Sequence, residues 1–196
     1  MPFSEKALRL IFEFEGLNQP GTWPGGFSGI TLGIGYDLGY VTMDQFESDW
    51  GERIGRPTVN RLRVGVGLRG PRARARAPGF ADIRIRQEPA ERVFIERTLP
   101  LTALRTAQAF PGFEALPLDA QGALVSLVYN RGASMVDRPG EDRRREMRAV
   151  RRAVEQGDLQ EVARQIRSMQ RLWVGQGLDG LLRRREAEAA LVESCL

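Results

Sequence analysis

Two glutamates close to the N-terminus, in the stretch FEFEG of residues 12–16, are the first side chains whose types and spacing suggest chemistry. The chain has no histidine and a single cysteine, Cys195. These counts exclude Ser-His and Cys-His triads, histidine-ligated zinc and an internal disulfide. Acid–base catalysis therefore falls to Asp, Glu, Tyr or the only lysine, Lys6.

The two glutamates differ in their position on a predicted helix. Residues 4–15 begin with a serine suited to capping and are followed by a glycine, which predicts a helix over this range. At ~100° per residue, Glu15 lies about 20° from Leu8 on the apolar stripe. Glu13 falls on the opposite, charged face, so we interpret it as a solvated side chain.

A carboxylate on an apolar face carries a desolvation cost, which raises its pKa. A carboxylic acid with a raised pKa suits general-acid catalysis. The alternative is that Glu15 ends the helix and reaches past the core into water. The helix geometry alone leaves both interpretations open.

The rest of the chain divides into three stretches. Residues 17–41 are rich in glycine and predict short twisted strands and tight turns. Thr42 and Gln45 form a capping-box pattern that opens a short helix. Residues 55–87 predict irregular or weakly strand-like structure, and the chain from Pro89 onward shows helical periodicity.

Arginine is concentrated in one segment of the chain. The net charge is +4, but residues 61–86 carry eight arginines and one aspartate. Such a patch attracts a polyanion, for example nucleic acid, anionic lipid or an acidic polymer. A solvated, arginine-rich loop is an equally valid interpretation.

The surroundings of Glu15 resemble a known family. FEG followed by SGITLGIGYDLG (residues 28–39) resembles the start of phage-type lysozymes, in which a helix-ending Glu-Gly precedes a small β lobe with a T-x-G-x-G pattern. Here that pattern is Thr31 to Gly35. The closest likeness is to pesticin-like bacteriolytic toxins. These carry a serine-glycine-apolar-threonine run, here residues 28–31, followed by an aromatic-Asp-Leu-Gly run, here residues 36–39.

The resemblance continues along nearly the whole chain. ALVSLVYNRG (residues 123–132) is similar to the family's central helix with its Asn-x-Gly ending, and Trp173 matches a frequent tryptophan. GLLRRREAEAAL (residues 180–191) is similar to its closing pattern. One departure is that the better-known phage enzymes carry an aspartate where this chain has Pro24. The pesticin-like pattern then implies Asp37 as the second carboxylate.

The resemblance implies a mainly helical α+β fold of the lysozyme type. It implies one catalytic domain over residues 1–196, with a small β lobe at about 17–60. The helical lobe would comprise residues 1–16 and about 88–196.

The function implied is that of a muramidase, which hydrolyses the β-1,4 bond between N-acetylmuramic acid and N-acetylglucosamine. Glycosidic cleavage generally needs two carboxyl groups that flank the bond. Glu15 would be the general acid, while Asp37 and Thr31 would stabilise the sugar cation or position water. For Asp37 the alternative is a side chain that caps turn amides, and for Thr31 a β-branched strand residue. No metal or organic cofactor is implied.

Several other residues are expected to serve the architecture. We expect Asn130 to cap a helix and Trp173 to lie in the core. Arg184 and Glu188, four residues apart, are expected to pair across a helical turn.

The expected partners are peptidoglycan glycan strands and not nucleic acid. We expect a monomer, and the sequence has no apolar run long enough to predict a membrane span. No secretory signal is recognised at the N-terminus. We therefore expect synthesis in the cytoplasm and action in the periplasm or cell wall of a target, after release or injection. A phage lysin, a bacteriocin and a secreted effector remain open, as do an immunity protein or a secretion-system component as partner.

Two alternative functions also remain open. The first is a non-catalytic nucleic-acid or cell-wall binding protein that uses residues 61–86. The second is a lytic transglycosylase, which needs one glutamate and no second carboxylate.

Overall fold

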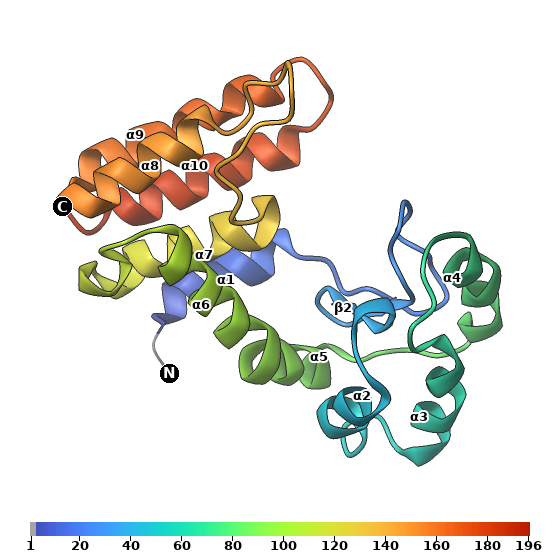
Figure 1. Cartoon of the computed structure of the whole chain (residues 1–196). Coiled ribbons are helices and arrows are strands. Elements are labelled where there is room, and N and C mark those ends of the chain that lie inside the picture. Colours follow the sequence, from blue (N-terminus) through green and yellow to red (C-terminus); the bar gives the residue numbers. More distant parts are fainter. Residues whose placement is uncertain (1–2) are drawn as a thin grey trace. The chain divides into compact units, whose positions relative to one another are not determined.

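The computed structural model describes residues 3–196 as two compact units (Figure 1). The first, which we call the helical unit, comprises the chain up to Phe14 together with Leu101–Leu196. The second, the β-containing unit, comprises Glu15–Pro100. The expectation of a mainly helical α+β fold with a small β-containing part is confirmed.

The helical unit is built around one buried helix. Helix α7 (Leu118–Arg131) is covered by α1 (Glu5–Phe14) and α10 (Asp179–Glu193). In α7 a side chain on Gly122 would begin 2.0 Å from the Ala7 Cβ, so this glycine permits the close approach of α1. The other helices are α6 (Leu99–Ala109), α8 (Arg145–Gln156) and α9 (Leu159–Ser168). Helices α8, α9 and α10 lie side by side (Figure 1).

Helix α1 forms where the sequence predicts it. The amide of Ala7 donates to Ser4 Oγ at 3.1 Å, which confirms the serine as the N-terminal cap. Ala7, Leu10 and Ile11 are buried and face the unit's core. The helix ends at Phe14, one residue before Glu15.

The β-containing unit holds one two-stranded antiparallel sheet, β1 (Thr31–Leu32) and β2 (Tyr36–Asp37). The turn between them needs Gly33 and Gly35, whose φ angles are +60° and +64°. A side chain on Gly33 would also meet the ring of Trp50 at 2.8 Å. The glycines of the T-x-G-x-G pattern therefore serve a left-handed turn packed against an aromatic core.

Short helices make up most of the remaining β-containing unit. Helix α2 (Met43–Trp50) is capped at its N-terminus by Thr42, whose Oγ1 accepts from the amide of Gln45 at 3.2 Å, as expected. The helices that follow are α3 (Arg56–Leu62), α4 (Gly70–Arg76) and α5 (Gln87–Val93). Pro89 lies in the first turn of α5, as predicted. Single 3₁₀ turns cover Leu38–Tyr40, Arg63–Gly65 and Ala77–Phe80, and a π-helical turn covers Phe94–Thr98.

The prediction of irregular or weakly strand-like structure for residues 55–87 is wrong. Helices α3 and α4 occupy much of this range, and both carry proline in the first turn, where its missing N–H costs nothing. Ala73, Ala77 and Phe80 are buried at spacings of four and three, which is a helical period. The arginines between these small residues concealed that period.

The expected architectural roles are partly confirmed. Trp173 is buried, as predicted, and the guanidinium of Arg131 lies 5.0 Å from its ring centre. The expectation that Asn130 caps α7 is wrong. The capping residue is Gly132, which follows the last helical residue and whose φ of +75° takes the chain out of the helix.

A buried polar cluster joins α7 to α10. Arg184 pairs with Glu188 at 3.2 Å, as predicted, and Arg185 donates to the same carboxylate at 2.7 Å. The hydroxyl of Ser126 donates to Glu188 at 2.6 Å and accepts from Arg184. Burial raises the pKa of Glu188, and the two arginines oppose that rise. Because these groups are withdrawn from water, each depends on the others for its hydrogen bonds.

We predict that Glu188→Gln lowers the free energy of unfolding by about 3 kcal/mol, because it leaves two buried guanidinium groups without their carboxylate. Glu186→Gln, on the same helix, breaks an exposed pair with Arg167 and should cost less than about 1 kcal/mol. Urea unfolding followed by circular dichroism measures both. Equal losses for the two variants would contradict the importance assigned to the buried cluster.

Candidate active site

Asp37 is an acidic side chain of the β-containing unit that is held by backbone amides. The amide of Gly29 donates to both of its carboxylate oxygens at 2.9 Å. The amide of Gly39 donates to Oδ1 at 2.8 Å, so Asp37 also caps the 3₁₀ turn that follows β2. The side chain is half-buried. Backbone donors fix the position of this carboxylate more firmly than flexible side chains would.

Two glycines make room for this carboxylate. A Cβ on Gly29 would lie 2.2 Å from Asp37 Oδ1 and 2.4 Å from the amide of Gly39. A Cβ on Gly39 would lie 2.7 Å from the carbonyl oxygen of Leu68. Both positions therefore require glycine because of close approach, although neither has a positive φ angle.

Thr31 lies directly opposite Asp37 in the sheet. The antiparallel register pairs Thr31 with Asp37 and Leu32 with Tyr36. Side chains of directly opposed residues share one face, with Cβ atoms roughly 4.5–5.5 Å apart. Thr31 is buried, and its hydroxyl lies 3.5 Å from the carbonyl oxygen of Gly29. The sheet therefore brings two of the three predicted catalytic residues together.

Glu15 lies at the start of the β-containing unit, immediately after α1, and is half-buried. Asn18 attaches this part of the chain to the hairpin, because its amide and carbonyl bond with Gly33 at 2.7 and 2.9 Å. The side-chain amide of Asn18 donates to the carbonyl oxygen of Gly33 at 3.1 Å. Three peptide units separate Glu15 from Asn18, so the Cα atoms of these two residues lie at most about 11 Å apart.

A second buried interaction holds β2, and the sequence interpretation did not find it. The hydroxyl of Tyr36 donates to Asp49 at 2.7 Å, and Asp49 pairs with Arg97 at 2.8 Å. Burial and the bond to Asp49 raise the pKa of Tyr36. Trp50 packs edge-on against the Tyr36 ring at 5.6 Å between ring centres. Asp49 was detectable as an acid on the apolar face of α2, next to Phe46 and Trp50.

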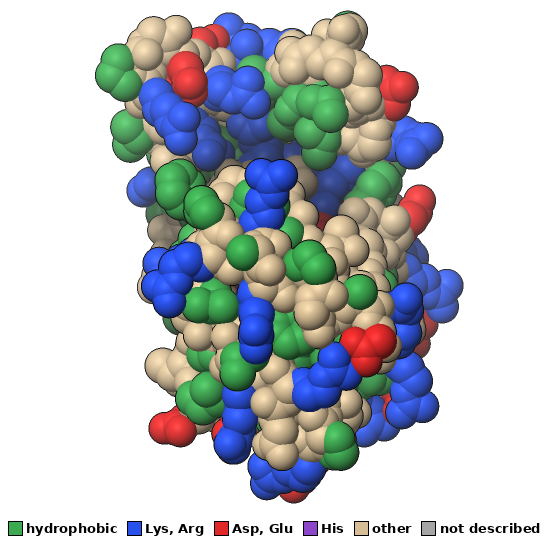
Figure 2. All heavy atoms as spheres, turned by 90° about the vertical axis from the view of Figure 1, so that its right-hand side faces the viewer, with side chains coloured by type: hydrophobic (Ala, Val, Ile, Leu, Met, Phe, Trp, Pro, Cys, Tyr) green, Lys and Arg blue, Asp and Glu red, His purple; other side chains and the backbone are tan. Residues whose placement is uncertain are grey.

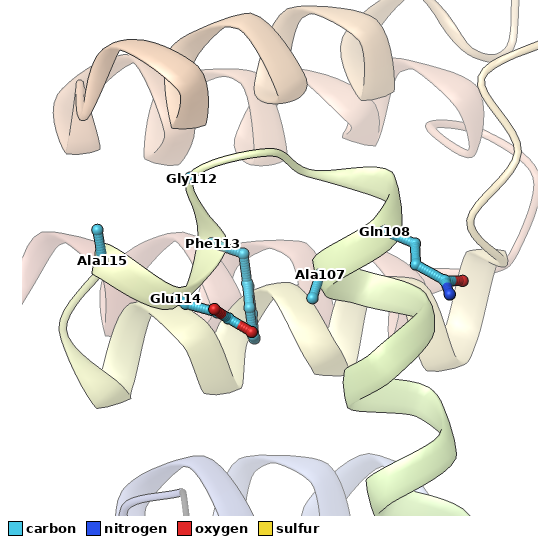
Figure 3. A pocket seen from close by; sticks show the side chains of 6 residues that line it. All are labelled: Ala107, Gln108, Gly112, Phe113, Glu114 and Ala115. Carbon is cyan, nitrogen blue, oxygen red and sulfur yellow. The ribbon is translucent and has the colours of Figure 1, made fainter.

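The helical unit contains a separate open pocket of about 490 Å³ (Figure 3). It is lined by Ala107, Gln108, Gly112, Phe113, Glu114 and Ala115. Glu114 is its only carboxylate, and none of the predicted catalytic residues lines it. Its composition therefore does not suit glycosidic cleavage by paired carboxyl groups.

Within residues 3–196, no three His, Cys, Asp or Glu side chains are grouped so as to hold a metal ion. None of the helices in this range has both the length and the apolar character that crossing a bilayer requires.

Residues 56–188 match the family model described as phage lysozyme. This range contains α3 to α9 and most of α10. It begins after Asp37, so Glu15, Thr31 and Asp37 lie outside the matched part. No curated protein matches the chain.

We predict that Gly29→Ala destabilises the protein by about 1–3 kcal/mol, because the new methyl group must displace the Asp37 carboxylate. Gly79→Ala is the matched control, since a side chain there meets open space and φ is not positive. Thermal unfolding measures stability, and amide NMR shifts of Gly39 report the lost bond. An unchanged Gly39 shift in the Gly29→Ala variant would contradict the geometry.

Proposed function

Because the chain belongs to the phage lysozyme family, a family of peptidoglycan-degrading glycoside hydrolases, we propose that it is a muramidase that uses Glu15, Asp37 and Thr31. The bond cleaved is the β-1,4 linkage from N-acetylmuramic acid to N-acetylglucosamine. The observation that carries the residue assignment is the register of the small sheet, which pairs Thr31 with a carboxylate fixed by backbone amides.

Glu15 is assigned the general acid. In glycoside hydrolysis, one carboxylic acid protonates the leaving oxygen while a second carboxylate acts on the other side of the sugar. Glu15 is half-buried at the end of α1, and Asn18 attaches the chain beyond it to the hairpin that carries Asp37. Both acids belong to the β-containing unit, which supports this assignment.

Asp37 is assigned the second carboxylate. Its bonds to Gly29 and Gly39 hold it in one orientation before substrate arrives, so no reorganisation is needed as positive charge develops on the sugar. The Thr31 hydroxyl, on the same face of the sheet, is assigned the positioning of a water molecule. No step of this mechanism requires a metal or organic cofactor.

We predict that Glu15→Gln lowers kcat on purified peptidoglycan by about 10²–10⁴-fold, because the amide cannot donate the proton. Glu13→Gln is the matched control, two residues away and exposed on α1, and should retain activity. Release of reducing ends measures the rate, and circular dichroism checks folding. Undiminished activity of Glu15→Gln would rule out its role. Anhydromuropeptides in place of reducing ends, detected by mass spectrometry, would indicate the lytic transglycosylase alternative.

Asp37→Asn separates catalysis from turn capping. The amide preserves size and one acceptor oxygen but removes the charge, so we expect kcat to fall by about 10²-fold or more while stability falls by only about 1 kcal/mol. Rates on peptidoglycan and thermal unfolding are measured on the same preparation. A variant that loses stability but keeps its kcat would identify Asp37 as a capping residue only.

A further inference from the structure

The arginine-rich segment, residues 61–86, exposes all eight of its arginine side chains. Two of them are neutralised, because Arg61 pairs with Asp82 at 2.5 Å and Arg63 pairs with Glu47. Within the described residues, the other six form no ion pair with a carboxylate: Arg69, Arg72, Arg74, Arg76, Arg84 and Arg86. Figure 2, which faces the side of the molecule where α4 lies in Figure 1, shows Lys and Arg side chains interspersed with hydrophobic ones.

Three of these arginines lie over aromatic rings, and one of them, Arg76, lies 5.9 Å from the centre of the buried Phe80 ring. The Arg69 guanidinium is 4.3 Å from the centre of the Tyr40 ring, and the Arg74 guanidinium is 5.9 Å from the Trp23 ring. Phe27, which is 82% exposed, follows the left-handed glycines of the preceding loop. We call Trp23, Phe27, Tyr40, Arg69 and Arg74 the aromatic–arginine face.

This face is bonded to the loops that hold Asp37. Arg69 Nε donates to the carbonyl of Gly39 at 2.7 Å, and the amide of Gly39 donates to Asp37. The Tyr40 hydroxyl donates to the carbonyl of Phe27 at 3.1 Å. The start of α4 joins the same loop, since the amide of Gly70 donates to the carbonyl of Ser28 at 3.0 Å. The aromatic–arginine face is therefore continuous with the candidate active site within one unit.

We propose that the aromatic–arginine face binds the glycan strand beside the cleaved linkage, with Arg74 pairing with a carboxylate of a stem peptide. This inference rests on the proposed function. Exposed aromatic rings offer flat, partly polar surfaces to a sugar ring. A guanidinium matches a carboxylate with two parallel hydrogen bonds, and those of Arg69 and Arg74 have no carboxylate partner within residues 3–196. The stacking holds both guanidinium groups in place before the ligand arrives.

A glycan with carboxylate-bearing stems suits this face better than a lipid surface does. Phe27 is the one aromatic side chain of the face that is almost fully exposed, whereas guanidinium groups lie over the other two rings. A bilayer favours a contiguous apolar patch. The alternation of rings and positive charges instead matches a polymer that alternates sugar rings and carboxylates.

The test compares Arg74→Gln with Arg72→Gln on the same helix. Two residues apart at ~100° each, these side chains point to roughly opposite sides of α4, and both variants remove one positive charge. Each is made in the Glu15→Gln chain, in which we expect cleavage to be slowed, and its binding to purified peptidoglycan is measured by co-sedimentation. The same measurement uses glycan strands from which an amidase has removed the stem peptides, after the lactyl carboxylate that this hydrolysis leaves on each muramic acid has been converted to an amide.

Arg74→Gln should weaken binding to intact peptidoglycan about three- to tenfold and leave binding to stripped strands unchanged. Phe27→Ala should weaken binding to both, because it removes a contact with the sugar. Arg72→Gln should change neither. Equal effects of Arg72→Gln and Arg74→Gln, or equal loss on intact and stripped strands, would overturn the carboxylate assignment.

Binding to anionic lipid vesicles and to duplex DNA is measured in parallel. Loss of vesicle or DNA binding in Arg74→Gln, with peptidoglycan binding intact, would assign the face to a different polyanion and overturn the proposal. Co-sedimentation needs no catalysis, so failure of the proposed function is seen separately, as a wild-type chain that binds peptidoglycan without cleaving it. A wild-type chain that cleaves while all three variants bind normally would overturn this inference alone.

Discussion

The bonds between the Asp37 carboxylate and the amides of Gly29 and Gly39 are the interaction on which the β-containing unit depends. They join the segment before β1 to the turn after β2, and so hold together a sheet that has only two residues in each strand. A sheet this short has few ladder hydrogen bonds of its own and is not stable alone. A carboxylate with backbone donors on two sides supplies the missing connection, while the sheet register places Thr31 beside it.

The structural role of Asp37 and the catalytic role that we propose for it do not compete. A carboxylate needed for structure must stay in one place, and a carboxylate that stabilises a developing positive charge must do so as well. Beneath the sheet, Tyr36, Asp49 and Arg97 hold β2 from its other face. The candidate site is therefore supported from both sides by interactions that need no substrate.

Arginine takes on the positively charged roles of a chain that has one lysine and no histidine. In the helical unit, Arg184 and Arg185 are buried around Glu188, and the planar guanidinium of Arg184 donates to Glu188 and to the hydroxyl and carbonyl of Ser126. In the β-containing unit, Arg69 and Arg74 lie on aromatic rings at the surface. Delocalised charge permits both settings, because a guanidinium is more weakly hydrated than an ammonium group and stacks on flat surfaces.

Local sequence determined the elements whose signals lie within a few residues. The capped starts of α1 and α2, the periodic helices from Pro89 onward and the pairing of Arg184 with Glu188 were all predictable, because caps and i, i+4 contacts are local. The small β-containing part followed from glycines that need a left-handed turn. The lysozyme-type fold followed from the resemblance to phage-type lysozymes, whose motifs occur in the same order along the chain.

Only the tertiary structure decided which distant groups meet. Helices α3 and α4 were missed because arginines mask an apolar period that becomes visible only when Ala73, Ala77 and Phe80 are seen to be buried. The amides that hold Asp37 come from residues eight before it and two after it, a pairing set by the sheet register and not by propensity. The contact of Arg69 with Gly39 spans 30 residues, and no local rule predicts such a distance. Propensity acts between neighbours along the chain, whereas a site is assembled by packing.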